Sequence, residues 1–434
     1  MSPIVVGIIC IILMFVLMFS RVPIAISMAV PGILGAVYLR GMDAVGSMLN
    51  TVVWDQSASY IFSTIPLFVL MGELLFAANI TKDLFDSFRK WFGGLRGGLG
   101  IATIGASSIF AASSGSSIAA TGTMGLIATN EMRESNYKDS FAGGTVVAGG
   151  TLGVLIPPST AFIIYGLMAD QSIGQLLIAG IIPGVMLTII YMGIVFLSVT
   201  INPSLAPRSD LKFTWKEKFA SLKSTIWFIA LFVLVIGGMY IGIFSPTESA
   251  GIGAAGALTL CLIRGGLTFE KVVTAFSRTL KTTSFMFAII LGAYILNYFL
   301  ALTRLPIMLA EWITNSGISM YGFLFLIIIL YILLGMVMDL VAVMVITMPV
   351  FLPTLIAFDF DLIWFGVIVV ILIEMAMITP PVGINCFVLK GAVPDLHLGD
   401  IFNGAIRFVI GLAILLVLMI LFPQIPLFLP GFLM

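Results

Sequence analysis

Long runs of apolar residues, separated by short polar segments, recur along the whole chain of 434 residues. A run of about 20 apolar residues is long enough to cross a lipid bilayer as a helix. The pattern predicts ten such spans, at residues 4–20, 23–39, 60–79, 140–168, 174–200, 225–244, 247–263, 283–302, 363–389 and 402–422. We therefore expect an all-α, polytopic membrane protein.

Two further apolar stretches, about 97–130 and about 321–357, fit poorly as single spans. Each is too long for one helix and carries small or polar residues near its middle. A re-entrant helical hairpin fits both stretches better, and it is tolerated in a membrane where protein covers its tip.

The two halves of the chain resemble each other at an offset of about 222 residues. Thr81-Lys82 before Trp91 recurs as Thr303-Arg304 before Trp312, and Ile156-Pro157-Pro158 recurs as Thr379-Pro380-Pro381. Each half is predicted to hold five spans and one hairpin. Because five is odd, the second half is inverted in the membrane. We expect repeats at 1–200 and 225–434, joined by a basic linker at 201–224.

Each repeat also contains an amphipathic arm, at 41–58 and 266–281. In the second arm, apolar residues at helical spacing lie opposite Glu270, Lys271, Arg278 and Lys281. This pattern suits a helix in the plane of the membrane interface, followed by a separate span. An ordinary amphipathic connector fits it equally well.

Lysine and arginine residues predict the orientation, because they gather on the cytoplasmic side of membrane proteins. With the N-terminus outside, all 20 of these residues except Arg40 and Arg304 lie on one side. Both termini are then periplasmic and the linker is cytoplasmic. A cysteine at Leu211 should accordingly react with an impermeant thiol reagent only from the cytoplasm.

Composition supports a membrane protein and excludes several classes of function. The chain is 60% hydrophobic and 9% charged, whereas soluble domains carry about 25% charged residues. Its net charge is zero, so nothing suggests nucleic acid. Cys10, Cys261 and Cys386 form no CxxC pair, and His397 is the one histidine. The first apolar run lacks a basic start and a cleavage site, so we interpret it as a membrane helix, not a signal peptide.

The tip of the first hairpin is a run of small polar residues, Ser113-Ser114-Gly115-Ser116-Ser117. Hydroxyl and free carbonyl oxygens are ligands that a small cation needs, and glycine lets a neighbour approach closely. A small-residue packing face is the alternative, since such faces are common in membranes. The number of serines favours an ion site.

Paired prolines interrupt one span in each half. A proline in a helix leaves the carbonyl four residues earlier without its hydrogen bond. The freed carbonyls are predicted at Gly153 and Val154 in the first half and at Ala376 and Met377 in the second. In hydrocarbon they need a partner. Bound Na⁺ is one candidate, and water or a Ser/Thr hydroxyl at a simple kink is the other.

Acidic residues inside apolar runs are candidates for function, because a buried carboxylate is costly without a role or a partner. Asp339 aligns near Ser116 and belongs to the tip of the second hairpin. For Glu73 and Glu374, a structural role and a transport role are equally consistent with the sequence. Glu248 is better explained as a helix-capping residue.

These features together resemble the large membrane subunit of tripartite ATP-independent periplasmic (TRAP) transporters, within the ion transporter superfamily. The resemblance covers essentially the whole chain. It is carried by Pro66–Gly72, Ser113–Ser117, Leu155–Ser159, Ser245–Glu248 and Thr379–Gly383. It implies an elevator-type transporter with a scaffold and a moving domain, which imports an organic acid on a Na⁺ gradient without ATP. The implied partners are a periplasmic substrate-binding protein and a separate small four-helix membrane subunit.

The resemblance also implies two sodium sites where each hairpin tip meets its broken helix. The first would use Ser113, Ser116, Gly153, Ile156 and Pro158. The second would use Gly335, Ala376, Thr379 and Val382, although many family members have glycine in place of Ala376. Substrate is expected at Ser114, Gly115, Ser159, Asp339 and Asn385.

The predicted function is Na⁺-coupled import of a small organic acid, such as a C4-dicarboxylate or sialic acid, across the bacterial inner membrane. A proton-coupled or stand-alone anion carrier of the same superfamily is the alternative, and Asp339 is the residue that favours this alternative. An enzyme is not expected, since a nucleophilic serine needs an adjacent base and His397 lies in a surface loop. No arginine or lysine is expected at the midplane, so backbone amides at helix N-termini would bind the carboxylate.

Overall fold

The computed structural model describes residues 1–78, 80–207, 213–265 and 268–433. Within these ranges every regular element is a helix. Leu211, the proposed labelling position in the linker, lies outside the described residues, so its predicted accessibility stays a prediction.

The first half of the chain folds into eleven α-helices among the described residues, with short 3₁₀ turns at Tyr60–Ser63 and Pro203–Leu205. The helices are α1 (Pro3–Phe19), α2 (Ile24–Arg40), α3 (Met42–Ser57), α4 (Thr64–Ala77), α5 (Ile80–Phe92), α6 (Gly98–Ser114), α7 (Ser117–Glu134), α8 (Asp139–Leu155), α9 (Thr160–Ala169), α10 (Ile173–Ala179) and α11 (Ile181–Ile201).

The second half follows a closely similar order. Its helices are α12 (Trp215–Tyr240), α13 (Pro246–Arg264), α14 (Phe269–Thr303), α15 (Leu305–Asn315), α16 (Met320–Gly335), α17 (Leu340–Ala357), α18 (Leu362–Met377), α19 (Ile384–Ala392), α20 (Leu398–Leu421) and α21 (Gln424–Leu433). The order from α4 to α9 recurs from α14 to α19, at the offset of about 222 residues that the sequence predicts.

Several helices are long and apolar enough to cross a membrane. Six helical segments of the described chain meet this criterion alone, and eight do if each of two bent helix pairs counts as one span. Other predicted spans are shorter apolar helices, among them α1, α2 and α18. The architecture is that of a multi-pass membrane protein.

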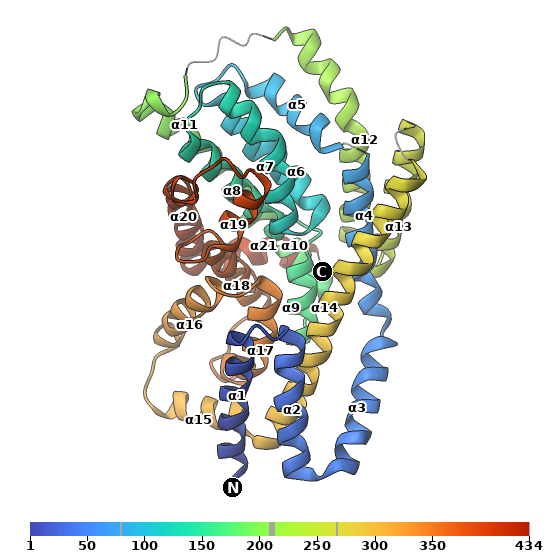
Figure 1. Cartoon of the computed structure of the whole chain (residues 1–434), viewed down its shortest axis with the longest axis vertical. Helices are drawn as coiled ribbons and strands as arrows, with labels where there is room; N and C mark the ends of the chain where they lie inside the picture. Colours follow the sequence, from blue (N-terminus) through green and yellow to red (C-terminus); the bar gives the residue numbers. More distant parts are fainter. Residues whose placement is uncertain (79, 208–212, 266–267, 434) are drawn as a thin grey trace.

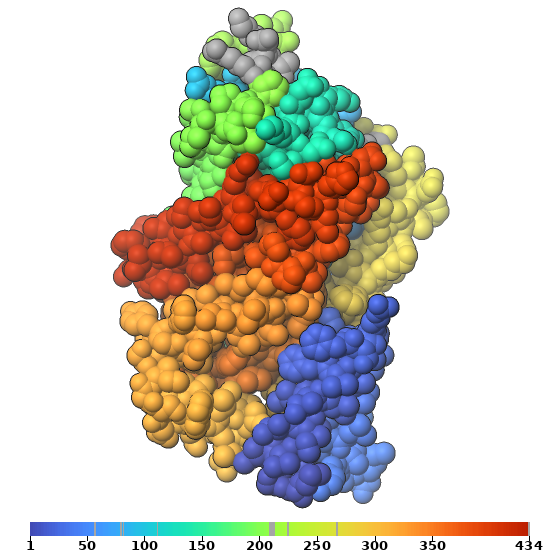
Figure 2. Space-filling view, turned by 60° about the vertical axis from the view of Figure 1, so that its left-hand side comes forward, coloured from blue at the N-terminus to red at the C-terminus, as the bar shows by residue number. Residues whose placement is uncertain are grey.

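Both predicted hairpins form as two helices joined by a short turn. Gly115 and Ser116 connect α6 to α7, and residues 336–339 connect α16 to α17. The pair α6–α7 lies in the upper half of Figure 1 and the pair α16–α17 in the lower half. The space-filling view shows the same separation, with the teal segment of α7 and α8 near the top and the orange segment of α15–α17 near the bottom (Figure 2).

Both predicted helix breaks also form at the paired prolines. The axis bends by 43° between α8 and α9. Residues 156–159, the first break, separate these helices, and residues 378–383, the second break, separate α18 from α19. Proline lacks the amide hydrogen that continues a helix, which places both breaks where the sequence predicts them.

The second arm differs from the prediction. Residues 269–303 form the single helix α14, so the arm and the following span are not separate elements. No proline or turn sequence interrupts this stretch. In the first half, by contrast, a short connection and a 3₁₀ turn separate α3 from α4.

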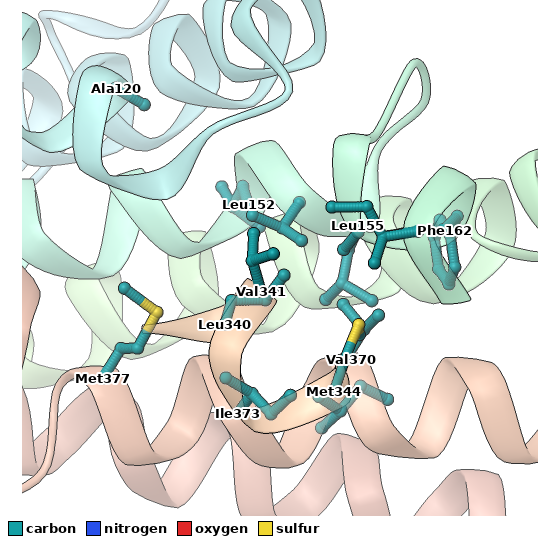
Figure 3. Close-up of a cluster of buried hydrophobic side chains, with 14 of the residues drawn as sticks. Ala120, Leu152, Leu155, Phe162, Leu340, Val341, Met344, Val370, Ile373 and Met377 are labelled. Carbon is teal, nitrogen blue, oxygen red and sulfur yellow. The ribbon is translucent and has the colours of Figure 1, made fainter. Parts of the chain in front are cut away.

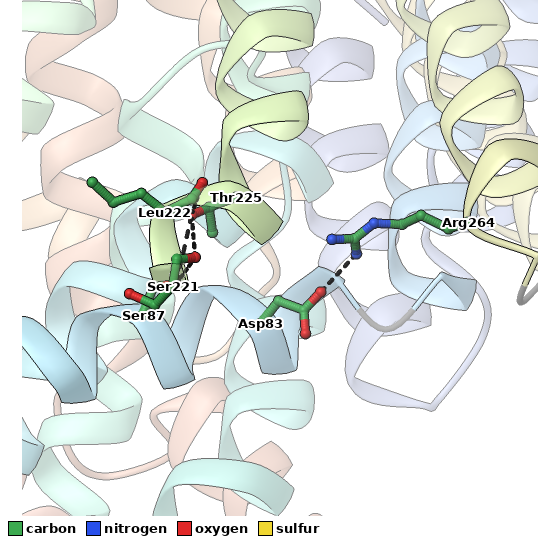
Figure 4. Close-up of polar contacts among 6 residues, drawn as sticks. All are labelled: Asp83, Ser87, Ser221, Leu222, Thr225 and Arg264. Atoms are coloured by element: carbon green, nitrogen blue, oxygen red, sulfur yellow. Dashed lines mark hydrogen bonds and ion pairs between the residues drawn. The ribbon is translucent and has the colours of Figure 1, made fainter. Parts of the chain in front are cut away.

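Helix α5 connects the first hairpin to α12 and α13 through polar contacts, and Figure 4 shows those with α12 and α13. The Asp83 carboxylate pairs with the Arg264 guanidinium at 2.7 Å. The Ser87 hydroxyl donates to the Ser221 carbonyl at 2.9 Å. At the other end of α5, Arg89 pairs with Glu131 of α7 at 2.9 Å. These contacts hold α5 between two parts of the molecule.

Candidate functional site

A cavity of about 610 Å³ lies where the two hairpin tips approach each other. Residues 114–117 of the first tip and residues 339–341 at the second tip both line it. Helix α4 contributes Glu73 and Phe76 to its wall, and α14 contributes Arg278. Residues more than 200 positions apart in the sequence therefore line one cavity.

The first tip is attached to the first break and to the start of α9. The Thr160 hydroxyl, at the start of α9, donates to the Gly115 carbonyl at 2.8 Å. Gly115 has a φ of +58°, which favours glycine, and a Cβ there would lie 2.9 Å from the Pro158 carbonyl oxygen. Both the backbone conformation and the close contact therefore require glycine at position 115.

The serines of the first tip make local hydrogen bonds. The buried Ser113 hydroxyl donates to the Phe110 carbonyl at 2.6 Å. The Ser116 hydroxyl caps α7 by accepting from the Ala119 amide at 3.3 Å. Ser113 and Pro158 also line one small gap against α4 and α12. Gly153 lies in the last turn of α8. Ile156 follows the end of this helix and lies two residues before Pro158.

The second tip meets the end of α18 through apolar contacts. A Cβ on Gly335 would lie 2.8 Å from the Ala376 Cβ, so the end of α16 contacts the end of α18. Figure 3 shows Leu340, Val341 and Met344 of α17 packed among side chains of α8 and α18. The apolar first turn of α17 therefore anchors this tip in the core.

One carbonyl of the second break differs from the sequence expectation. The Ala376 carbonyl, expected to lack a hydrogen bond, accepts one from the Thr379 amide at 3.1 Å. The Thr379 hydroxyl donates to the Met375 carbonyl at 2.6 Å. The chain forms a tighter turn after Met375. A hydrogen bond from the residue three positions after Ala376 therefore replaces the one from four positions after it, which Pro380 cannot donate. Val382 lies half-buried in the turn that follows.

The residues expected to contact substrate divide into two groups. Ser114, Gly115 and Asp339 line the cavity. The Asp339 carboxylate also caps α17, accepting from the Ala342 amide at 3.4 Å. Ser159 instead caps α9 while fully buried, and Asn385 is fully buried on α19. Neither belongs to the cavity lining.

Arg278 is the cavity residue that the sequence reasoning missed. Its guanidinium lies 3.8 Å from the Glu73 carboxylate and 5.6 Å from the ring centre of Phe76. The prediction assigned Arg278 to an arm outside the core, but α14 is continuous and carries it to the cavity. The available signal was helical spacing, because Thr282, Phe285 and Met286 line the same wall.

The other acids have distinct environments. Glu248 caps α13, where the Ser245 amide and hydroxyl both donate to its carboxylate at 2.8 Å, in agreement with the capping interpretation. Glu73 is half-buried and faces the cavity. Glu374 is fully buried on α18 and is not among the residues that line the cavity.

Comparison with known proteins gives a consistent picture. The family model "Tripartite ATP-independent periplasmic transporter, DctM component" matches residues 11–425. The chain is 33% identical to the C4-dicarboxylate TRAP transporter large permease protein DctM of Pseudomonas aeruginosa, over 93% of this chain and 94% of that protein. It is 31% identical to the sialic acid TRAP transporter large permease protein SiaM of Vibrio cholerae, over 84% and 85%.

Solved structures with a similar fold are more distant in sequence. The Alcanivorax borkumensis YdaH transporter superposes with a TM-score of 0.63 at 15% identity, covering 88% of this chain and 90% of that one. Neisseria gonorrhoeae MtrF gives 0.61 at 12% identity, over 96% and 95%. At these identities the likeness concerns the fold alone.

Proposed function

Because the chain belongs to the DctM component family of TRAP transporters, we propose that it is the large permease subunit of one, and that it imports a small organic acid. Relatives named for C4-dicarboxylates, sialic acid and 2,3-diketo-L-gulonate support an acidic substrate. The observation that carries the proposal is the cavity between the two tips, whose lining includes Arg278, the serines of the first tip and the N-terminus of α7.

Arg278 is the proposed partner of the substrate carboxylate. A guanidinium offers paired donors that match a carboxylate. Its present partner, Glu73, is 3.8 Å away, which is longer than a charge-assisted hydrogen bond. An incoming acid can therefore compete with Glu73 for Arg278. The first backbone amides of α7 and the hydroxyls of Ser114 and Ser116 complete the polar wall.

Two Na⁺ ions are proposed at the two places where a tip meets a break. The first site consists of Ser113, Ser116, Gly153, Ile156 and Pro158. The second consists of Gly335, Ala376, Thr379 and Val382. Hydroxyl and carbonyl oxygens close to helix ends are the usual ligands for coupling ions in transporters built from repeats. Bound Na⁺ would also offset the negative charge of the substrate within the protein.

Transport would proceed by an elevator movement. The hairpins and the broken helices would move together against a scaffold that includes α2, α4, α13 and α14, and the two halves would be inverted repeats. The recurring helix order and the opposite placement of the hairpins support this mechanism. Both chain termini would be periplasmic. A small membrane subunit and a periplasmic substrate-binding protein would complete the transporter.

The test is uptake by the reconstituted transporter. The chain would be purified with its small subunit, placed in liposomes and supplied with a binding protein loaded with a labelled C4-dicarboxylate or sialic acid. An inward Na⁺ gradient, an inward proton gradient and no gradient would be compared. Uptake that needs both Na⁺ and the binding protein is the expected result. Proton-driven uptake, or uptake without a binding protein, would favour the stand-alone carrier and direct attention to Asp339.

A variant of Arg278 tests the cavity itself. Arg278→Gln should lower uptake by about 10-fold to 100-fold, since a hydrogen bond to a charged group contributes about 1.5–3 kcal/mol. Lys281→Gln is the matched control, because Lys281 lies on the same helix, is exposed and does not line the cavity. Equal uptake by both variants would remove Arg278 from the substrate site.

A further inference from the structure

Glu374 is a buried acid to which the proposed transport mechanism gives no role. Its side chain is fully buried on α18, and neither carboxylate oxygen has a hydrogen-bond partner in the structure. None of the ion pairs among the described residues involves it. Burial of an unpaired carboxylate costs several kcal/mol or more, so the charge needs a neutralising species.

Polar groups of α7 lie next to this carboxylate. The Ser117 hydroxyl faces Glu374, although its own hydrogen-bond partner is the Met377 sulfur at 3.8 Å. Glu374 and Met377 are three residues apart and lie on the same face of α18, toward α7. One turn beyond Ser117, the Thr121 hydroxyl is buried and has no partner. It lies so close to α8 that a Cβ on Gly150 would collide with it.

Asn385 of α19 approaches the same part of α7. Val388 and Leu389 face Gly122 and Gly125 of α7, respectively, so the two helices run in parallel along this contact. One turn earlier on both helices, the register brings Asn385 beside the Ser117–Thr121 turn. The Asn385 amide is fully buried, and neither its oxygen nor its nitrogen has a partner.

We propose that Glu374, Ser117, Thr121 and Asn385 bind a further Na⁺ ion between α7, α18 and α19. This site includes Ser117, the last residue of the first tip, but it shares no ligand with the two sites proposed above. Glu374 faces α7, whereas Ile373 and Ala376 face Gly335. A hard cation takes several oxygen ligands, and these side chains offer a carboxylate, two hydroxyls and an amide oxygen. A proton on Glu374 would supply a single donor, whereas a cation can bind the unpartnered oxygens of Thr121 and Asn385 together with the carboxylate. The proposal rests on the proposed Na⁺-coupled function and adds an ion to it.

Equilibrium binding of radioactive Na⁺ to the purified complex of both membrane subunits tests the site without any transport step. Glu374→Gln should bind one Na⁺ fewer per transporter than the wild type and should show a less steep Na⁺ dependence of uptake. Glu311→Gln, an exposed acid of α15, is the control and should bind the wild-type number. If Glu374→Gln does not fold, Thr121→Val removes a single hydroxyl and should weaken Na⁺ affinity at the same site.

The outcomes separate this site from the general function. The further site is wrong if Glu374→Gln binds as many Na⁺ ions as the wild type. If that variant does not fold, the further site is wrong if Thr121→Val keeps the wild-type Na⁺ affinity. In both cases the proposed Na⁺-coupled uptake is unaffected. An unchanged count with loss of the pH dependence of uptake would show that Glu374 carries a proton, which also overturns the proposal. If the wild type binds no Na⁺ at all, both the site and the proposed Na⁺ coupling are wrong.

Discussion

The turn between α6 and α7 consists of glycine and serine, whereas the equivalent turn between α16 and α17 consists of residues 336–339, Met-Val-Met-Asp. In the first half, Gly115 lets the backbone of the tip approach the break closely, and the Thr160 hydroxyl of α9 donates a hydrogen bond to the tip. In the second half, apolar side chains anchor the tip, and the carboxylate of Asp339 caps the next helix. The first tip is therefore held by polar backbone contacts, whereas the second tip is held by hydrophobic packing and carries one charged side chain.

The arms differ as well. The first arm, α3, is separated from α4 by a 3₁₀ turn, whereas the second arm is the beginning of α14. Helix α14 therefore brings a basic residue to the cavity, and the first half offers Glu73 of α4 opposite it. The cavity therefore receives one acid, Glu73, from the first half and both a basic residue, Arg278, and an acid, Asp339, from the second half.

The largest effect is expected from replacing the tip glycines. The Gly115→Ala variant would have to keep a positive φ at this position, which costs residues other than glycine about 1–2 kcal/mol. Its Cβ would also lie 2.9 Å from the Pro158 carbonyl oxygen. Gly335→Ala meets only a methyl group of Ala376 at 2.8 Å, in a helix with ordinary φ. We expect uptake to fall more than about 10-fold for Gly115→Ala and less for Gly335→Ala. The opposite order in an uptake assay with equal protein amounts would contradict the difference between the tips.

An intermediate effect is expected from the charge at the second tip. Asparagine caps a helix about as well as aspartate, so Asp339→Asn should leave the melting temperature nearly unchanged. Uptake should fall several-fold, because the carboxylate lines the cavity. Asp361→Asn is the matched control, since Asp361 caps α18 with two amide contacts at 2.9 Å outside the cavity. Equal uptake by both variants would show that Asp339 serves only as the N-cap of α17.

The smallest effects are expected from two threonine hydroxyls. Thr379→Ala should weaken the Na⁺ dependence of uptake, because Thr379 belongs to the proposed second Na⁺ site. Folding should be unaffected, because the Thr379 hydroxyl donates only to the Met375 carbonyl four residues earlier. Thr160→Ala should instead lower stability by about 1 kcal/mol, since it removes the bond that ties the first tip to α9. Na⁺ titrations and thermal unfolding of both variants would distinguish these roles. Unchanged Na⁺ activation in Thr379→Ala would exclude Thr379 from an ion site.

The sequence predicted the features that depend on local chemistry. Paired prolines interrupt a helix in which they occur, and the structure has helix ends at both pairs. Small or polar residues near the middle of a long apolar run indicate a turn, and the structure has a turn within both such stretches. Arg278 was missed because its position depends on whether α14 continues through residues 281–283, which local hydrophobicity does not decide. Ser159 and Asn385 were assigned to the substrate from their proximity to the breaks. Which way their side chains face depends on packing between distant helices.

The continuity of α14 has a mechanical consequence. An uninterrupted α-helix resists bending because each turn is hydrogen-bonded to the next, and it rises about 1.5 Å per residue. Gly292 of α14 is in close contact with the backbone of Ala25 on α2. Arg278 lies about 21 Å further along the same rod. Because α14 is continuous, a tilt of this helix at its contact with α2 would displace the guanidinium in the cavity without altering any residue that lines it.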